Sequence, residues 1–151
     1  MPITVRRYSN ADAEFLRALA DEAFSEYDGD GERAASKVVA MTNAARAHTL
    51  VAERSNRPTG FVTLSMGDEG AHIAAIAVVR DARGRGIGAR LLRAAEALAR
   101  KLGARVALLE TGEANLAALD MFLRAGYRID GRLPRYYRTG YDALTLRRTL
   151  D

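Results

Sequence analysis

The sequence predicts an α/β fold built on a mixed, mostly antiparallel seven-stranded sheet with helices on both faces. Residues 72–79 form a nearly continuous apolar run, which is typical of a strand buried on both faces. An amphipathic helical pattern over 87–102 and a second apolar run at 106–109 follow it, and this succession predicts a parallel strand pair. The short turn at 55–59 predicts antiparallel neighbours.

The first part of the chain predicts one strand and two helices. Apolar and polar residues alternate over 3–8, as in a half-buried strand. Ser9 and Asn10 offer an N-cap to a helix. The apolar positions expected on the buried face of that helix are Phe15, Leu16, Leu19, Ala23 and Phe24. An acidic turn at 28–31 leads into a second helix, expected over 32–46.

The rest of the chain predicts alternating strands and helices. Strands are expected at 49–53 and 60–65, on either side of the turn. A helix at 116–123 is closed by Gly126, and two further strands are expected at 127–130 and 143–150. The predicted order is therefore β-α-α-β-β-β-α-β-α-β-β, in one domain covering residues 1–151.

Composition narrows the class of protein. A length of 151 residues is typical of one domain, and no apolar run approaches the roughly 20 residues that span a bilayer. The N-terminus carries no signal-peptide pattern, so we expect a cytoplasmic protein without a membrane partner. The chain has no cysteine, which excludes disulfides, thiolate metal sites and a cysteine nucleophile.

The net charge of +4 and the isoelectric point near 9.8 leave two interpretations open. A basic surface attracts nucleic acid, but it attracts a phosphate-rich cofactor equally well. The arginines are scattered along the chain rather than gathered in one block. We therefore expect no nucleic-acid partner.

Residues 83–89 (RGRGIGA) are the most informative stretch, because they connect a buried strand to a long helix. The first N–H groups of a helix are unpaired and carry partial positive charge, so they bind phosphates. Gly84, Gly86 and Gly88 allow the backbone to approach an anion closely. Arg83 and Arg85 add charged donors. The loop therefore predicts a pyrophosphate site.

The same loop also satisfies the dinucleotide-binding pattern Gly84-x-Gly86-x-x-Ala89, with Glu110 where a ribose-binding acid belongs. Two features argue against a dehydrogenase. Residues 80–83 separate the strand from the glycines, and the chain holds only one such unit, with no second half or substrate domain.

The pattern Arg83-x-x-Gly86-x-Gly88, after the strand at 76–78, resembles the acetyl-CoA signature of the GNAT N-acetyltransferases. The element order resembles that fold over nearly the whole chain. The resemblance implies that acetyl-CoA is the acyl donor. The residues that it assigns to the pyrophosphate are Arg83, Gly84, Arg85, Gly86, Ile87, Gly88 and Ala89. The strand edge at Ile76, Ala77 and Val78 would pair with the pantetheine amides.

The segment from residue 106 to 127 resembles the second signature of the family. Within the family it most resembles the N-terminal protein acetyltransferases, particularly the bacterial ribosomal-protein alanine acetyltransferases. The resemblance implies that Glu110 is the general base and that Asn115 contacts the cofactor. Tyr136 and Tyr137, followed by Asp-Ala at 142–143, resemble the peptide-binding hairpin of those enzymes. An N-terminal α-amine of a protein or peptide is therefore the expected acceptor.

The chemistry of the acceptor explains why one carboxylate suffices. The amine must be neutral to attack a thioester, and an α-amine with a pKa of about 8 costs about 1.4 kcal/mol to deprotonate at pH 7. A lysine amine with a pKa of about 10.4 costs about 4.6 kcal/mol. Glu110 acting through a water is able to remove that proton. The alternative is that Glu110 is a solvated carboxylate at a strand end.

Phe122 departs from the family pattern. Related enzymes usually have a tyrosine there, credited with protonating the departing thiolate, and Phe122 lines the cofactor site without donating a proton. Tyr136, Tyr137 or a water then serves as the acid, with Tyr137 the named candidate, or the thiolate leaves unassisted. A non-catalytic sensor that binds acyl-CoA is a further interpretation.

His48 and His72 are expected to be ordinary core or surface histidines, because neither has a second ligand at metal-binding spacing in the sequence. No metal is predicted. A small-molecule amine is the alternative acceptor. In the family the first two helices usually shape the acceptor site, and the sequence of these two helices does not indicate which amine they would bind. The sequence is consistent with a monomer or a homodimer.

Overall fold

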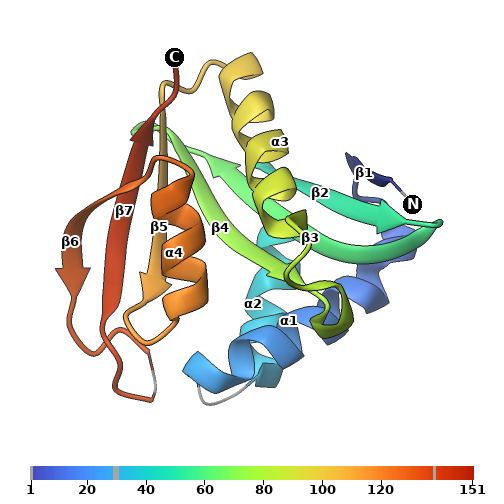
Figure 1. Cartoon of the computed structure of the whole chain (residues 1–151), viewed down its shortest axis with the longest axis horizontal. Helices are drawn as coiled ribbons and strands as arrows, with labels where there is room; N and C mark the ends of the chain where they lie inside the picture. The colour runs from blue at the N-terminus through green and yellow to red at the C-terminus, as the bar shows by residue number, and fades with distance from the viewer. Residues whose placement is uncertain (1, 29–30, 138) are drawn as a thin grey trace.

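The computed structural model describes residues 2–28, 31–137 and 139–151, and its elements follow the expected order (Figure 1). The strands are β1 (Ile3–Arg7), β2 (Ala47–Arg54), β3 (Arg57–Met66), β4 (Ala71–Val78), β5 (Val106–Gly112), β6 (Arg128–Leu133) and β7 (Ala143–Thr149). The helices are α1 (Ala13–Asp28), α2 (Gly31–Thr42), α3 (Ile87–Lys101) and α4 (Leu116–Arg124). Short 3-10 turns precede α1 (η1, Asn10–Asp12) and follow β4 (η2, Arg80–Ala82).

The seven strands form one sheet in the order β1-β2-β3-β4-β5-β7-β6. Every neighbouring pair is antiparallel except β4 and β5, which run parallel. The mixed, mostly antiparallel sheet predicted from the sequence is therefore confirmed. The β4–β5 pair holds only at Ala71↔Ala107 and His72↔Leu108, and the two strands then diverge toward their C-terminal ends (Figure 1).

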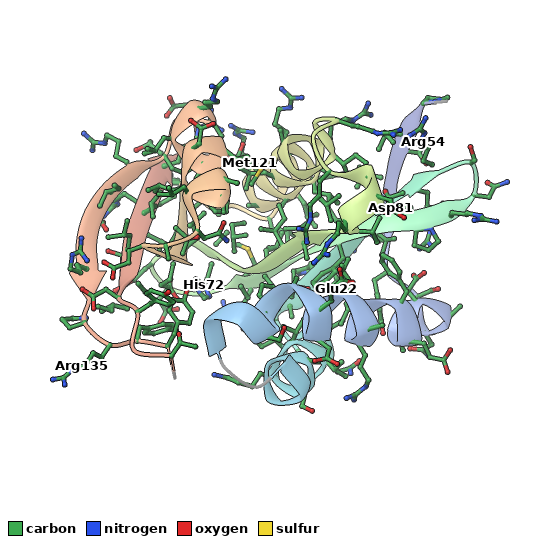
Figure 2. All side chains as sticks on the ribbon, turned by 60° about the horizontal axis from the view of Figure 1, so that its bottom comes forward. Glu22, Arg54, His72, Asp81, Met121 and Arg135 are labelled. Atoms are coloured by element: carbon green, nitrogen blue, oxygen red, sulfur yellow. The ribbon has the colours of Figure 1, made fainter. Side chains whose placement is uncertain are left out.

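Two hydrophobic clusters cover the two faces of the sheet. Figure 2 shows α3 and α4 on one face and α1 and α2 on the other. On the face covered by α1 and α2, Leu16 of α1 and Val38 of α2 pack with Phe61 of β3. Leu91 of α3 and Leu109 of β5 belong to the opposite cluster. The sheet is thus buried on both sides, which explains the continuous apolar run of β4.

A β-bulge interrupts β4 at Ala74. Leu64 of β3 pairs with Ile73 and Thr63 pairs with Ala75, so Ala74 is an extra residue on β4. Side chains normally alternate between the faces of a strand, but Ile73 and Ala75 belong to opposite clusters. Beyond the bulge, the alternation of faces along β4 is therefore reversed. His72, which lies before the bulge, is on the face of α1 and α2.

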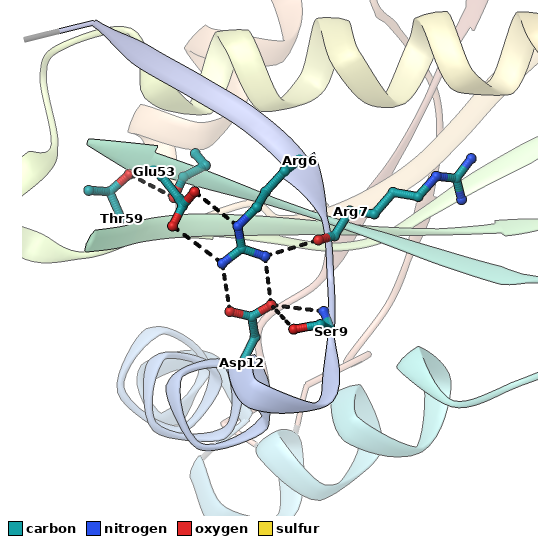
Figure 3. Close-up of polar contacts among 7 residues, drawn as sticks. Arg6, Arg7, Ser9, Asp12, Glu53 and Thr59 are labelled. Atoms are coloured by element: carbon teal, nitrogen blue, oxygen red, sulfur yellow. Dashed lines mark hydrogen bonds and ion pairs between the residues drawn. The ribbon is translucent and has the colours of Figure 1, made fainter. Parts of the chain in front are cut away.

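Helix α1 is fixed to the sheet by an ion cluster at its start (Figure 3). The guanidinium of Arg6 donates two hydrogen bonds of 2.8 Å to Asp12, and its Nε lies 3.0 Å from Glu53 of β2. Asp12 is buried and also accepts the Ser9 N–H at 2.8 Å. The hydrogen bonds from Arg6 hold the pKa of Asp12 below its usual value. The pairing thus satisfies a carboxylate that burial would otherwise destabilise.

Several boundaries differ from those expected, and two of them have a clear local cause. Helix α2 ends at Thr42 rather than at Arg46, because the Arg46 carbonyl accepts the Met66 N–H at 3.0 Å and the chain already pairs with the sheet. The β2–β3 turn shrinks to Ser55 and Asn56, which have φ values of 53° and 62°. Two consecutive residues with positive φ form the tight turn that joins antiparallel strands with least distortion.

The acidic turn expected at 28–31 includes residues 29 and 30, which lie outside the described part of the chain. In the part that the structure describes, no helix has the length and apolar character needed to cross a membrane.

Candidate active site

A cavity of about 420 Å³ lies where β4 and β5 diverge. The gap between the two strands opens through the sheet, so residues on both faces of the sheet line the cavity. Phe24, Lys37, Val38 and Met41 line it from α1 and α2, and Asn115, Ala118 and Phe122 line it from the α4 side. The remaining lining residues are His72 to Ile76 of β4, Leu109 to Gly112 of β5, and Tyr136 and Tyr137.

The glycine loop precedes α3 at the end of the diverging β4. Gly84 and Gly86 have φ values of 77° and 79°, in the left-handed region that favours glycine. A Cβ built on either residue meets nothing within 4 Å, so the space beside this backbone is open. Gly86 is the N-cap of α3, and the N–H groups of the first turn have no partner within the helix. This open, donor-rich backbone suits an anion.

Gly88 brings the start of α3 close to its neighbours. A Cβ at Gly88 would lie 2.9 Å from the sulfur of Met121 in α4 and 3.9 Å from Val78 in β4. The position therefore has room for no side chain unless Met121 moves. The glycine at this site lets the start of α3 pack against both the diverging strand and α4.

The open edge of β4 presents alternate backbone groups to the gap. The Val79 N–H donates to Thr59 on β3, so residues 79 and 77 turn their polar groups toward β3. Ile76 and Val78 therefore turn theirs toward the gap, and the Val78 carbonyl accepts the Nε–H of Arg83 at 3.0 Å. Of the three residues expected to offer backbone groups, Ala77 is the one that faces β3.

His72 and Glu110 form a pair at the cavity wall. The imidazole Nε2 lies 3.0 and 2.9 Å from the two carboxylate oxygens of Glu110. Both side chains are partly exposed. The hydrogen bond to Glu110 raises the pKa of His72 above its ordinary value, and desolvation partly opposes that shift. The pair thus places an imidazole and a carboxylate, in contact with each other, at the wall of the cavity.

Asn115 and Phe122 lie on α4 where the sequence places them. Asn115 is the N-cap of α4, and its side-chain oxygen accepts the Ala118 N–H at 3.2 Å. The Phe122 ring is buried and lies edge-on to Tyr127, with centroids 5.9 Å apart. The Tyr127 hydroxyl donates to the buried carboxylate of Glu96 at 2.8 Å. Tyr127 is therefore committed to the core and unsuited to proton transfer in the cavity.

Tyr136 and Tyr137 lie in the connection between β6 and β7, here named the tyrosine loop (residues 134–142, of which 138 lies outside the described residues). Their rings meet edge-on with centroids 5.1 Å apart, and both line the cavity. The Tyr137 N–H donates to the Tyr141 carbonyl at 3.2 Å, and its carbonyl accepts the Gly140 N–H at 2.9 Å. The loop thus brings two aromatic side chains toward the His72–Glu110 pair.

Sequence reasoning missed His72. The sequence shows no ligand at metal-binding spacing from His72 and gives no sign that Glu110 lies beside it. In the structure the parallel register sets His72 beside Leu108, and Glu110 follows two residues later on the same face. A prediction of that register would have found the pair. Phe24, Lys37, Val38 and Met41 were also missed as lining residues, because nothing in the sequence fixes how α1 and α2 meet the sheet.

Comparison with known proteins identifies the class. The model of the acetyltransferase (GNAT) family matches residues 13–127. An uncharacterized N-acetyltransferase of Methanocaldococcus jannaschii is 29% identical over 143 residues, which cover 94% of this chain and 88% of that protein. N-alpha-acetyltransferase 30 of Schizosaccharomyces pombe is 39% identical over 72 residues, 48% of each protein.

A solved structure supports the fold. The ribosomal-protein-S18-alanine N-acetyltransferase of Escherichia coli superimposes with a TM-score of 0.83 at 20% identity, over 99% of this chain and 95% of that one. The chain belongs to the GNAT acetyltransferase family. It is thus an N-acetyltransferase that uses acetyl-CoA, as the glycine loop and the element order led us to expect.

The residues present fit this cosubstrate. The open space beside Gly84 and Gly86, at the N-terminus of a 15-residue helix, accommodates a pyrophosphate. The outward-facing backbone groups suit the amides of pantetheine, because Ile76 turns an N–H and a C=O toward the gap and Val78 turns an N–H toward it, while the Val78 carbonyl accepts from Arg83. Within the described residues, no group of three or more His, Asp or Glu side chains is arranged to hold a metal ion.

Proposed function

We propose that this enzyme acetylates the N-terminal α-amine of a protein or peptide. The observation that carries the proposal is the cavity that passes through the sheet between β4 and β5. On one side it is lined by α4 and by the part of β4 that leads toward the glycine loop. On the other it is lined by α1, α2 and the tyrosine loop, with the His72–Glu110 pair between them. A donor and an acceptor can therefore meet from opposite faces.

An extended acceptor suits the second side of the cavity. Its wall is largely apolar, with Phe24, Val38 and Met41 opposite Tyr136 and Tyr137. Tyrosines bind peptide backbone and side chains well, because they combine a large apolar face with a hydroxyl. The likeness to an N-alpha-acetyltransferase over half the chain supports the same acceptor class.

Acetyl-CoA, when bound, supplies an activated thioester carbonyl for attack by a neutral amine. The part of this chain is to make the amine neutral and to hold it. We assign that proton transfer to Glu110 together with neutral His72, whose contact of 2.9 Å orients both groups. Backbone N–H groups at the open edge of β4 are placed to polarise a carbonyl oxygen. Arg83, Arg85 and the glycine loop bind phosphate.

The proton for the departing thiolate needs a separate source, because Phe122 has no dissociable proton. We propose Tyr137 as that acid, since it lines the same cavity as Glu110. Tyr136 is the alternative.

The test is coenzyme A release from acetyl-CoA with the purified protein, using peptides with free N-termini and a panel of small amines. We expect turnover on peptides, with mass spectrometry placing the acetyl group on the α-amine. The matched control is each peptide with a blocked N-terminus and an internal lysine, which should stay unmodified. Activity restricted to small amines would contradict the peptide assignment. Binding of acetyl-CoA without transfer to any acceptor would favour a sensor.

Two further parts of the proposal concern the cell and the assembly. We propose a cytoplasmic location and a monomeric or homodimeric state. Cell fractionation and light scattering on the purified protein test them.

A further inference from the structure

An exposed ion cluster lies at the base of the tyrosine loop. Arg132, on β6, donates from one nitrogen (Nη1) to Glu113 and, at 2.8 Å, to Asp142. Glu113 lies in the connection between β5 and α4, and Asp142 is the last residue of the loop before β7. The three residues, here named the latch, therefore join three separate segments of the chain.

Asp142 contributes its backbone as well as its carboxylate. Its carbonyl accepts the Glu113 N–H at 3.0 Å, and its N–H lies 3.4 Å from a carboxylate oxygen of Glu113. Its Oδ1 accepts the N–H of Arg135 at 2.9 Å, at the start of the loop. Asp142 thus ties the end of the loop both to its beginning and to the β5–α4 connection.

The latch and the candidate site share a short stretch of chain. Glu113 follows Glu110 by three residues and precedes Asn115 by two. The opposite end of the latch is the loop whose Tyr136 and Tyr137 line the cavity. Loosening the latch therefore changes the position of the tyrosines relative to the His72–Glu110 pair.

A loop ordered before substrate arrives binds more tightly than one ordered by it. Fixing the backbone of one residue costs about 1–2 kcal/mol, and a flexible loop takes that cost from the binding free energy. An isolated surface ion pair contributes little, but a shared cation with backbone hydrogen bonds restricts several residues together.

We propose that Glu113, Arg132 and Asp142 are positioning residues that hold the tyrosine loop in its acceptor-binding conformation. The latch sets the KM for the acceptor and, because Tyr137 is also the proposed acid, contributes to kcat, and it leaves acetyl-CoA binding unchanged. This inference rests on the proposed function, because it assigns the tyrosine loop to the acceptor.

The test compares Arg132→Gln with Asp130→Asn. Asp130 is an exposed carboxylate on the same strand that accepts a hydrogen bond from Thr145 and is outside the latch, which makes its variant a matched control. We expect Arg132→Gln to raise the acceptor KM about tenfold and to lower kcat by less than Tyr137→Phe does, with the KM for acetyl-CoA and the melting temperature close to those of the wild type. Arg132→Lys keeps the charge and should recover part of the loss, and Asp130→Asn should match the wild type.

Hydrogen exchange of the tyrosine loop, measured without substrates, gives an independent readout. Arg132→Gln should speed exchange at 134–142, and Asp130→Asn should not. Faster exchange with an unchanged acceptor KM would overturn the proposal, and so would a variant in which neither quantity changes. A wild-type enzyme active only on small amines would refute the peptide acceptor instead. The latch would then be measured with that amine and judged by the same two quantities.

Discussion

Replacing Glu110 with Gln removes the charge of the candidate base and keeps its shape. Its carboxylate oxygens lie 2.9 and 3.0 Å from His72 Nε2, so the change also removes the ion pair. A general base contributes about 10²–10⁴ in rate. About one α-amine in ten is already neutral at pH 7 without a base, so the loss of Glu110 should cost less than the full contribution of a general base. We expect kcat/KM for a peptide to fall at least tenfold at neutral pH.

The pH profile separates this role from general damage. The hydrogen bond to Glu110 raises the pKa of His72, so the wild-type rate should rise as pH passes a value above 6.5. In Glu110→Gln that limb should move to lower pH, because the carboxylate is gone and desolvation still lowers the pKa. The deficit of the variant should also shrink toward pH 9, where solution deprotonates the amine.

The assay combines initial rates from pH 5.5 to 9 with NMR titration of His72. The control is Asp120→Asn, which replaces an exposed carboxylate of α4 paired with Arg124. Unchanged rates in Glu110→Gln would remove Glu110 from the mechanism. An unchanged His72 titration would refute the ion pair.

The raised pKa of His72 also predicts how the stability of the fold depends on pH. Protonated His72 stabilises the folded protein fully below its unfolded pKa, near 6.5, and this stabilisation disappears as the pH rises through its folded pKa. The wild type should therefore exceed Glu110→Gln in stability most clearly below pH 6.5. Urea denaturation at pH 6 and pH 9 measures the difference, and an equal gap at both would contradict it.

Further substitutions test separate parts of the molecule. Gly86→Ala places a side chain at a φ of 79°, which costs about 1–2 kcal/mol. Calorimetry should therefore show acetyl-CoA binding weakened by about tenfold. Unchanged affinity would exclude this backbone from the phosphate site. Tyr137→Phe should lower kcat at least tenfold if Tyr137 protonates the thiolate, and a larger effect of Tyr136→Phe would transfer that role. Tyr127→Phe removes the hydrogen bond to buried Glu96 and should destabilise the fold by about 1–3 kcal/mol in urea denaturation, with kcat unchanged; equal stability would mean that Arg148 alone satisfies Glu96.

The fold could be predicted because its signals are local. The apolar run of β4, the glycines at 84–88 and the amphipathic pattern of α3 each indicate their element without reference to the rest of the chain. The glycine loop at the start of α3 follows from the same signals, since the glycines and the helix start are adjacent in sequence. Glu110 and Asn115 were assigned by resemblance to the family, and the structure places both at the cavity.

The remainder of the site depends on contacts between distant segments. His72 and Glu110 are 38 residues apart and meet through strand register. The latch joins Glu113 to Asp142, 29 residues later, through the turn of a hairpin. In the sequence, Val38 and Met41 have the pattern of ordinary core residues of a helix. Only the packing of α2 against the sheet places them in the wall of the cavity. None of these contacts has a periodicity that a single sequence reveals.

The bulge at Ala74 has a consequence for how this strand is compared with its relatives. His72 and Ile76 lie four residues apart, an even spacing that would put both side chains on one face of a regular strand, and the extra residue places them on opposite faces. An alignment that opens a gap between these positions therefore equates residues that lie on opposite faces of the sheet. Catalytic assignments carried along β4 from another enzyme hold only where that enzyme has the same number of residues between the parallel pairing and the glycine loop.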